Sequence, residues 1–96
     1  MAQYLLQDQT TNVTGTGKAF FFRDGDPRYV NVAASGTFNG CTITIEESPD
    51  NTNWFAPTGT NTFTAAGAFV IEAPMKYLRA SVTNAGGSTS VTVQIQ

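Results

Sequence analysis

Residues 41–57, CTITIEESPDNTNWFAP, decide the fold because they join an extended strand to a turn and a second strand. Ile43 and Ile45 alternate with threonines, so they share one face of an extended segment. Residues 48–53 are dense in types that favour turns. The chain then returns in an extended run that opens on Trp54, the only tryptophan. This stretch therefore predicts two strands joined by a polar turn.

Similar units recur along the chain, where about seven or eight short runs are separated by turn residues at the spacing typical of sandwiches and barrels. No run shows helical periodicity longer than two turns, and consecutive strands without helices exclude a βαβ sheet. The sequence predicts an all-β fold, an antiparallel two-layer β-sandwich of about seven to eight short strands, immunoglobulin-like or jelly-roll. Residues 84–87, Asn-Ala-Gly-Gly, predict a hairpin before the last strand.

The length of 96 residues allows one domain built around one core. We divide the chain into an N-terminal arm with a first short strand, residues 1–12, and a single sandwich domain, residues 13–96. Hydrophobic residues make up 41%, enough for a core, whereas charged residues make up 12%, about half the usual share. The polar surface must therefore come from Thr, Ser, Asn and Gln.

Charge and hydropathy exclude two classes of partner. The net charge is −2 and the chain has only 5 Lys and Arg residues, too few for the basic patch of a nucleic-acid binder. No apolar run approaches the roughly 18 residues needed to cross a bilayer, so we expect no membrane partner. The first residues lack the basic and apolar regions of a secretory signal, which predicts synthesis in a cytoplasm.

No motif predicts catalysis. The chain has no histidine to act as a base, and Cys41 begins an alternating strand, where a small buried residue is expected. The sequence Asp24-Gly25-Asp26 lacks the other ligands of a calcium loop and is expected to be a turn. The spacing of the carboxylates selects no acid pair of the glycosidase kind. We therefore expect no enzyme activity, no catalytic residue, no metal site and no cofactor. The carboxylates are Asp8, Asp24, Asp26, Glu46, Glu47, Asp50 and Glu72.

Trp54 and Phe55 are neighbours in an extended run, so they point to opposite faces of it. We assign Trp54 to the core because its size favours burial, which makes Phe55 the better candidate for an interface. The alternative is that Trp54 is exposed and stacks on a ligand such as a sugar.

Two other apolar groups exceed what a small core is expected to hide. Phe20, Phe21 and Phe22 are consecutive, so at least one ring must point outward from a strand. The short arm around Leu5 and Leu6 is not expected to bury both leucines by itself. Self-association would cover such side chains. The predicted interface residues are Tyr4, Leu5, Leu6, Phe20, Phe21, Phe22 and Phe55.

Two segments resemble small phage-encoded virion proteins. Residues 43–54 resemble their unit of a strand, Glu, x, Ser, x, Asp, a turn and Trp, with Asp50-Asn51 where those proteins often have Asp-Gly. Residues 77–87 are similar to their Tyr, x, Arg, x, x, Val, Thr strand before a final hairpin. The second segment also resembles the penultimate strand of fibronectin type III domains. The resemblance covers residues 41–96.

This resemblance implies a non-enzymatic structural protein of a bacteriophage virion, synthesised in the host cytoplasm. It implies a capsid decoration (cement) protein or a small tail or fibre component, often trimeric, that binds other virion proteins. Residues 2–8 would then add a strand to a neighbouring subunit. The alternative is a tail- or fibre-associated module that binds a glycan or receptor through Trp54, Phe55 and the turn at residues 50–53.

Overall fold

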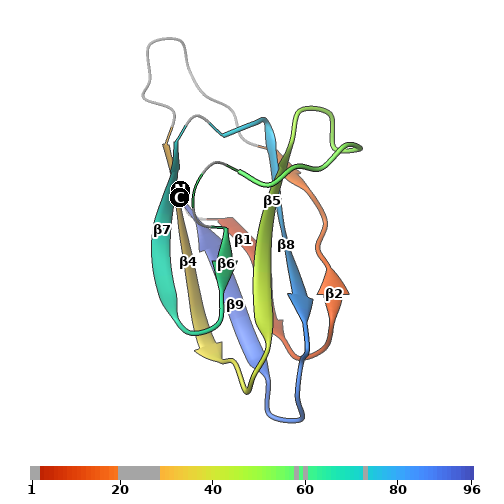
Figure 1. Ribbon diagram of the computed structural model, residues 1–96, viewed down its shortest axis with the longest axis vertical. Helices are drawn as coiled ribbons and strands as arrows, with labels where there is room; N and C mark the ends of the chain where they lie inside the picture. The colour runs from red at the N-terminus through yellow and green to blue at the C-terminus, as the bar shows by residue number, and fades with distance from the viewer. Residues whose placement is uncertain (1–2, 20–28, 58, 60, 73) are drawn as a thin grey trace.

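The computed structural model describes residues 3–19, 29–57, 59, 61–72 and 74–96. Every regular element in these ranges is a strand, and the strands form two antiparallel sheets that pack face to face (Figure 1). The all-β, two-layer sandwich predicted from the sequence is confirmed. The strands are β1 (Gln3–Gln9), β2 (Val13–Thr14), β3 (Lys18–Ala19), β4 (Tyr29–Thr37), β5 (Thr42–Ser48), β6 (Thr62–Phe63), β7 (Gly67–Glu72), β8 (Tyr77–Thr83) and β9 (Ser90–Ile95).

Sheet I has the strand order β1-β9-β4-β7, and sheet II has the order β2-β8-β5-β6, with β3 also paired to β8. The chain forms more strands than expected because β2, β3 and β6 are each only 2 residues long. The strands β2 and β3 pair with different parts of β8, so together they make one interrupted edge of sheet II.

The core lies between the sheets and follows the alternation of the strands. Ile43 and Ile45 of β5 are fully buried, as their period of two predicts. They face the inward residues of β4 and β9 in the opposite sheet. Burying an aliphatic side chain of this size contributes about 1.5–3 kcal/mol, so this layer is the main source of stability. The largest side chains that are fully buried are Ile43, Ile45, Ile71, Leu78, Ile95, Val30, Val32, Val82, Val91 and Val93.

The connections β4–β5 and β8–β9 are two of those that cross between the sheets at one end of the sandwich (Figure 1). Between β4 and β5, Asn39 and Gly40 both have positive φ, 48° and 87°, as the central residues of a type I′ turn do. The connection from β8 to β9 lies against it, because the Thr89 hydroxyl donates a buried 2.9 Å hydrogen bond to the carbonyl of Phe38. Gly86 lies so close to Asn39 that a Cβ there would force the Asn39 side chain to move. The hairpin predicted at residues 84–87 is wrong, because β8 and β9 belong to different sheets.

The strand β1 is an edge strand of sheet I, paired with β9 from Gln3 to Gln9. Its register shifts between Tyr4 and Leu6, which is the signature of a β-bulge. A bulge interrupts the alternation of faces, so Leu5 and Leu6 are both buried, with 5% and 7% of their surface exposed. The expectation that the arm leaves leucine exposed is therefore wrong, and the arm completes the sheet of its own chain.

Candidate interaction surfaces

The outer face of sheet I is almost uncharged. The register places Tyr4, Gln94, Ala33 and Ala68 opposite one another in a row that crosses all four strands. Glu72 is the only charged residue among the outward positions of β9, β4 and β7 together with Tyr4. These positions are Ser90, Thr92, Gln94, Tyr29, Asn31, Ala33, Ser35, Thr37, Ala68, Val70, Glu72 and Tyr4.

The same face carries most of the large hydrophobic side chains that the described residues leave exposed. Tyr4 on β1 is 44% exposed, Tyr29 on β4 is 55% exposed and Val70 on β7 is 52% exposed. Phe55, at 49%, is the other exposed side chain of this kind and lies outside sheet I. Exposed apolar groups gathered on an uncharged sheet face mark a contact surface.

The outer face of sheet II is polar in its central strands. The register places Thr14, Ser81, Thr44 and Thr62 in one row across β2, β8, β5 and β6. Each of these side chains ends in a hydroxyl, which exchanges hydrogen bonds with water in either direction. This row leaves the central strands of sheet II well solvated without a protein partner.

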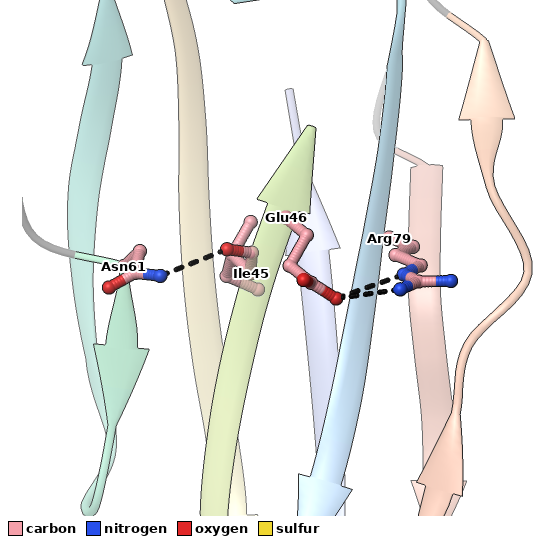
Figure 2. A network of polar contacts seen from close by, with 4 residues as sticks. All are labelled: Ile45, Glu46, Asn61 and Arg79. Carbon is pink, nitrogen blue, oxygen red and sulfur yellow. Dashed lines mark hydrogen bonds and ion pairs between the residues drawn. The ribbon is translucent and has the colours of Figure 1, made fainter. Parts of the chain in front are cut away.

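Next to this row, three side chains from separate parts of the chain contact one another. Glu46 of β5 lies opposite Arg79 of β8, and one carboxylate oxygen accepts hydrogen bonds from Arg79 Nε at 3.0 Å and Nη2 at 2.9 Å (Figure 2). The guanidinium of Arg79 also lies 4.2 Å from the centre of the Trp54 ring. A cation over an aromatic ring is attracted by the ring's negative face. We call these three residues the Trp54–Arg79–Glu46 cluster.

The position of Trp54 corrects the prediction that it belongs to the core. Trp54 is half-buried and is absent from the buried cluster between the sheets. Phe55 exchanges two backbone hydrogen bonds with Glu47, and Glu47 alternates in phase with the inward residues Ile43 and Ile45. Trp54, one position earlier, is therefore on the outer side, where Arg79 packs against it. Arg79 covers one face of the Trp54 ring, so a ligand that stacked on that face would have to displace the guanidinium.

Residues 48–53 form a turn that satisfies its own polar groups. The carboxylate of Asp50 accepts hydrogen bonds from the backbone N–H groups of Thr52 and Asn53, each at 2.9 Å, and from the Asn53 side-chain amide at 2.8 Å. Ser48 adds its hydroxyl at 3.0 Å. The backbone hydrogen bonds from Asn53 and Thr52 are the main reason why the pKa of Asp50 is held well below its usual range. Asn51 has a positive φ of 63°, a conformation that asparagine adopts more readily than most residues other than glycine.

Farther along the fold, Asn61 anchors the short edge strand β6 to β5. Its backbone carbonyl accepts a hydrogen bond from the N–H of Ile45 at 2.8 Å, and its side-chain amide donates to the Ile45 carbonyl at 3.3 Å (Figure 2). The backbone N–H and C=O of Ile45 are therefore both hydrogen-bonded to Asn61, so the polar atoms of Asn61 stabilise the pairing of β6 with β5.

The remaining reactive groups do not gather into a site. Glu47 is buried and its carboxylate accepts a 3.0 Å hydrogen bond from the backbone N–H of Met75. Cys41 is buried, and desolvation raises the pKa of its thiol. No group of three or more His, Cys, Asp or Glu side chains among the described residues could hold a metal ion. The same residues contain no helix long and apolar enough to cross a membrane. Asp24 and Asp26 lie outside the described ranges.

A groove of about 400 Å³ runs between β1 and residues 13–18, at the side of the sandwich where these two edges meet. Gly15 is one of the residues that line it, and its N–H donates a 2.8 Å hydrogen bond to the carbonyl of Ala80. Leu5 and Leu6 contribute to its lining along with polar residues such as Gln7, Thr16 and others.

The predicted interface residues have different positions. Tyr4 and Phe55 are exposed, Leu5 and Leu6 are buried, and residues 20–22 lie outside the described residues. Sequence reasoning did not select Tyr29 or Val70. The alternation at residues 28–34 places Tyr29 on the same face as Asn31 and Ala33. The polar character of that face is the feature of the sequence that could have identified Tyr29 as exposed. Val70 lies in an apolar run whose inward and outward faces look alike in the sequence.

Comparison with protein-family models, with curated proteins and with solved structures finds no match for this chain.

Proposed function

We propose that this protein is a non-enzymatic structural protein that associates with copies of itself and attaches to a larger assembly through the outer face of sheet I. The observation that carries this proposal is the exposure of Tyr4, Tyr29 and Val70 on a sheet face whose outward positions on β4, β7 and β9 include one carboxylate. The resemblance to phage virion proteins favours a capsid decoration (cement) protein as the specific role, located on the virion.

The energy available from this face favours a repetitive partner. Each half-exposed Tyr or Val contributes about 1 kcal/mol when the rest of its surface is buried. Three such side chains contribute less than the roughly 4–15 kcal/mol of translational and rotational freedom lost on association. A single contact of this kind is therefore weak. Linked copies on a repeating surface gain affinity through effective concentration, and a virion offers such a surface.

The placement of the carboxylates supports a role without catalysis. Glu46 pairs with Arg79, Glu47 accepts a backbone hydrogen bond and Asp50 organises its own turn. Each of these acids is engaged by the fold. The chain also has no histidine, the side chain that most often serves as a general base.

The solution mass measured by light scattering over a range of concentrations tests this proposal. We expect the wild type to associate and Val70→Lys to dissociate it, because the change places a charge on an exposed apolar residue of the edge strand β7. The control is Thr44→Lys, which adds the same charge to the outer face of sheet II and should leave the mass unchanged. A wild-type protein that stays monomeric at every concentration contradicts the proposal.

The alternative, a glycan- or receptor-binding module, is favoured by one observation. Phe55 is exposed beside Trp54, and the polar turn at residues 50–53 lies next to them. A screen of immobilised glycans with wild type and Phe55→Ala tests this function. Binding that is lost in Phe55→Ala, in a protein with unchanged circular dichroism, would support it. Absence of glycan binding by the wild type would contradict this alternative, and the structural role would be the one function still proposed.

A further inference from the structure

Three of the four sheet edges are interrupted or short. The edge strand β1 has register shifts on either side of Leu6, and Asp8 has a positive φ of 49°. The opposite edge of sheet II is divided between β2 and β3. The strand β6 is only 2 residues long. Bulges, breaks and short strands all prevent an edge from pairing with another chain.

The fourth edge, β7, has none of these features. It pairs with β4 in an unbroken register from Tyr29 opposite Glu72 to Ala34 opposite Gly67. The sequence of β7, GAFVIE, contains no Lys, Arg or Pro. Natural proteins use such residues to protect exposed edges. Among the strands and loops of the described ranges, β7 is therefore the unprotected edge of the sandwich.

The hydrogen-bond pattern shows which backbone groups of β7 point away from β4. Asn31 of β4 exchanges two hydrogen bonds with Gln96, at 2.9 and 3.0 Å, so its N–H and C=O point away from β7. Val70 lies opposite Asn31 and forms a non-hydrogen-bonded pair with it. The N–H and C=O of Val70 consequently point to the free edge. By alternation, those of Ala68 and Glu72 do too, and none of the three bonds to another described residue.

We propose that β7 pairs with β7 of a second copy of this chain, antiparallel and about a two-fold axis, so that two sheets I join into one continuous sheet. This inference rests on the self-association proposed above and names the element that carries it. In the register centred on Val70, that residue lies opposite Val70 of the partner subunit. Glu72 then lies opposite Ala68 of the partner subunit.

This register suits the residues of β7. Ala68, Val70 and Glu72 are the residues with free backbone groups, and each meets another of the same set, so every free N–H and C=O along the strand gains a partner. The outward side chains of both copies stay on the same face. The single carboxylate of the strand meets an alanine, so like charges are not placed opposite each other.

The consequence is a dimer, or an assembly built from dimers, because a two-fold contact of one strand with itself closes. The trimer implied by the resemblance to virion proteins does not follow from this edge. The joined sheets would present the exposed tyrosines of both copies, Tyr4 and Tyr29, on one surface with few charges.

Light scattering and sedimentation of Val70→Pro test the pairing. Proline removes the N–H that points to the free edge and costs the fold no hydrogen bond there, and proline is tolerated at strand edges. We expect the dimer dissociation constant to rise at least about tenfold. The control Val70→Thr keeps both the backbone N–H and the preference for strands, and should stay within about threefold of the wild type. Ala33→Lys charges the centre of the same face away from the edge and should leave the dimer intact.

A cross-linking variant makes the test independent of the effect of proline on folding. Residues facing each other across an antiparallel ladder have Cα atoms about 5.5 Å apart, within the range that a disulfide spans. Val70→Cys should therefore form a covalent dimer when oxidised with diamide, whereas Ala33→Cys should not. The native Cys41 is buried and should not compete.

The outcomes separate the pairing from the proposed function. Dissociation by Val70→Pro, or cross-linking through position 70 alone, supports the β7 pairing. A wild type that associates but dissociates with Ala33→Lys and not with Val70→Pro overturns the pairing and leaves the structural role in place. An isolated trimer overturns the pairing as well. A monomeric wild type overturns both.

Discussion

Both outer faces of the sandwich are built from antiparallel strands, but they differ in whether their large side chains are covered by other side chains. On sheet II the large side chains contact one another, because Trp54 packs against Arg79 and Arg79 pairs with Glu46. On sheet I, Tyr4, Tyr29 and Val70 remain about half exposed. Both faces contain few charges, so charge alone does not distinguish them.

This difference indicates that a contact surface is identified by the large apolar side chains that remain exposed on it. A tryptophan attracts attention in the sequence as a binding residue, yet here its ring is covered by a residue of the same chain. The less conspicuous tyrosines and valine of sheet I have no such cover among the described residues. The comparison favours sheet I as the face that meets another molecule.

The largest expected effect comes from a substitution in the core, which lies between the two sheets. Leu6→Ala removes a buried side chain of β1 and should lower the free energy of unfolding by about 2–5 kcal/mol, because the neighbouring residues cannot fill the cavity. Tyr4→Ala, on the outward side of the same strand, should change it by less than about 1 kcal/mol. Urea unfolding followed by Trp54 fluorescence measures both. Equal effects would mean that β1 is not packed in the core.

The next effect tests the covered side of the comparison. Arg79→Ala removes the contact with Trp54 and the ion pair with Glu46, which together contribute about 1 kcal/mol at a partly exposed site. Trp54 should become more accessible, so its emission should shift to longer wavelength and acrylamide should quench it more strongly. The matched control is Gln94→Ala on sheet I, whose side chain bonds to no other described residue. An unchanged Trp54 spectrum in Arg79→Ala would contradict this account of sheet II.

A smaller effect concerns the turn beside Trp54 and depends on pH. Hydrogen bonds hold the pKa of Asp50 below its ordinary value of 3.8, so its carboxylate stabilises the folded state above that value. The contribution is lost as the pH falls below 3.8 toward the lowered pKa of the folded state. Asp50→Asn removes the charge, so wild type should be the more stable protein at neutral pH and the difference should shrink in acid. Urea unfolding at a series of pH values measures it, and a difference independent of pH would contradict it.

The smallest expected effect is that of salt, because we expect the association of the protein not to change with salt concentration. Association of two copies through β7 should be insensitive to salt, because the one charged residue of this strand, Glu72, would lie opposite Ala68 of the partner subunit and no ion pair would be screened. The mass from light scattering should stay the same between about 0.05 and 0.5 M NaCl, where the Debye length falls severalfold. Dissociation by salt would show that ion pairs stabilise the contact. The charged residues Arg79 and Glu46 of sheet II would then be the candidates for it.

The sequence predicts the sandwich well where one pleated face is buried. The alternation of Ile43 and Ile45 with threonines places both in the core, as observed. It fails for Leu5 and Leu6 because a bulge breaks the alternation, and a bulge has no clear signature in those residues. It also fails for residues 84–87, where the turn residues are right but the strands that they join lie in different sheets.

The candidate surfaces are predictable only in part, for a similar reason. Phe55 was expected to be exposed, and it is. Trp54 was assigned to the core because size favours burial, but its cover is Arg79, which is distant in the sequence and becomes a neighbour only through the pairing of β5 with β8. The edge of β7 depends on which strands lie beside it, and a single sequence does not specify that order.

The pairing of β1 with β9 also has a kinetic consequence. Gln3 lies opposite Ile95, so the contact that completes sheet I joins residues roughly 90 positions apart, and closing a loop of that length costs about 4 kcal/mol of chain entropy. During synthesis on the ribosome, β1 emerges first and its partner last. Sheet I is therefore completed only after β9 has left the exit tunnel, and contacts of such long range favour slow folding.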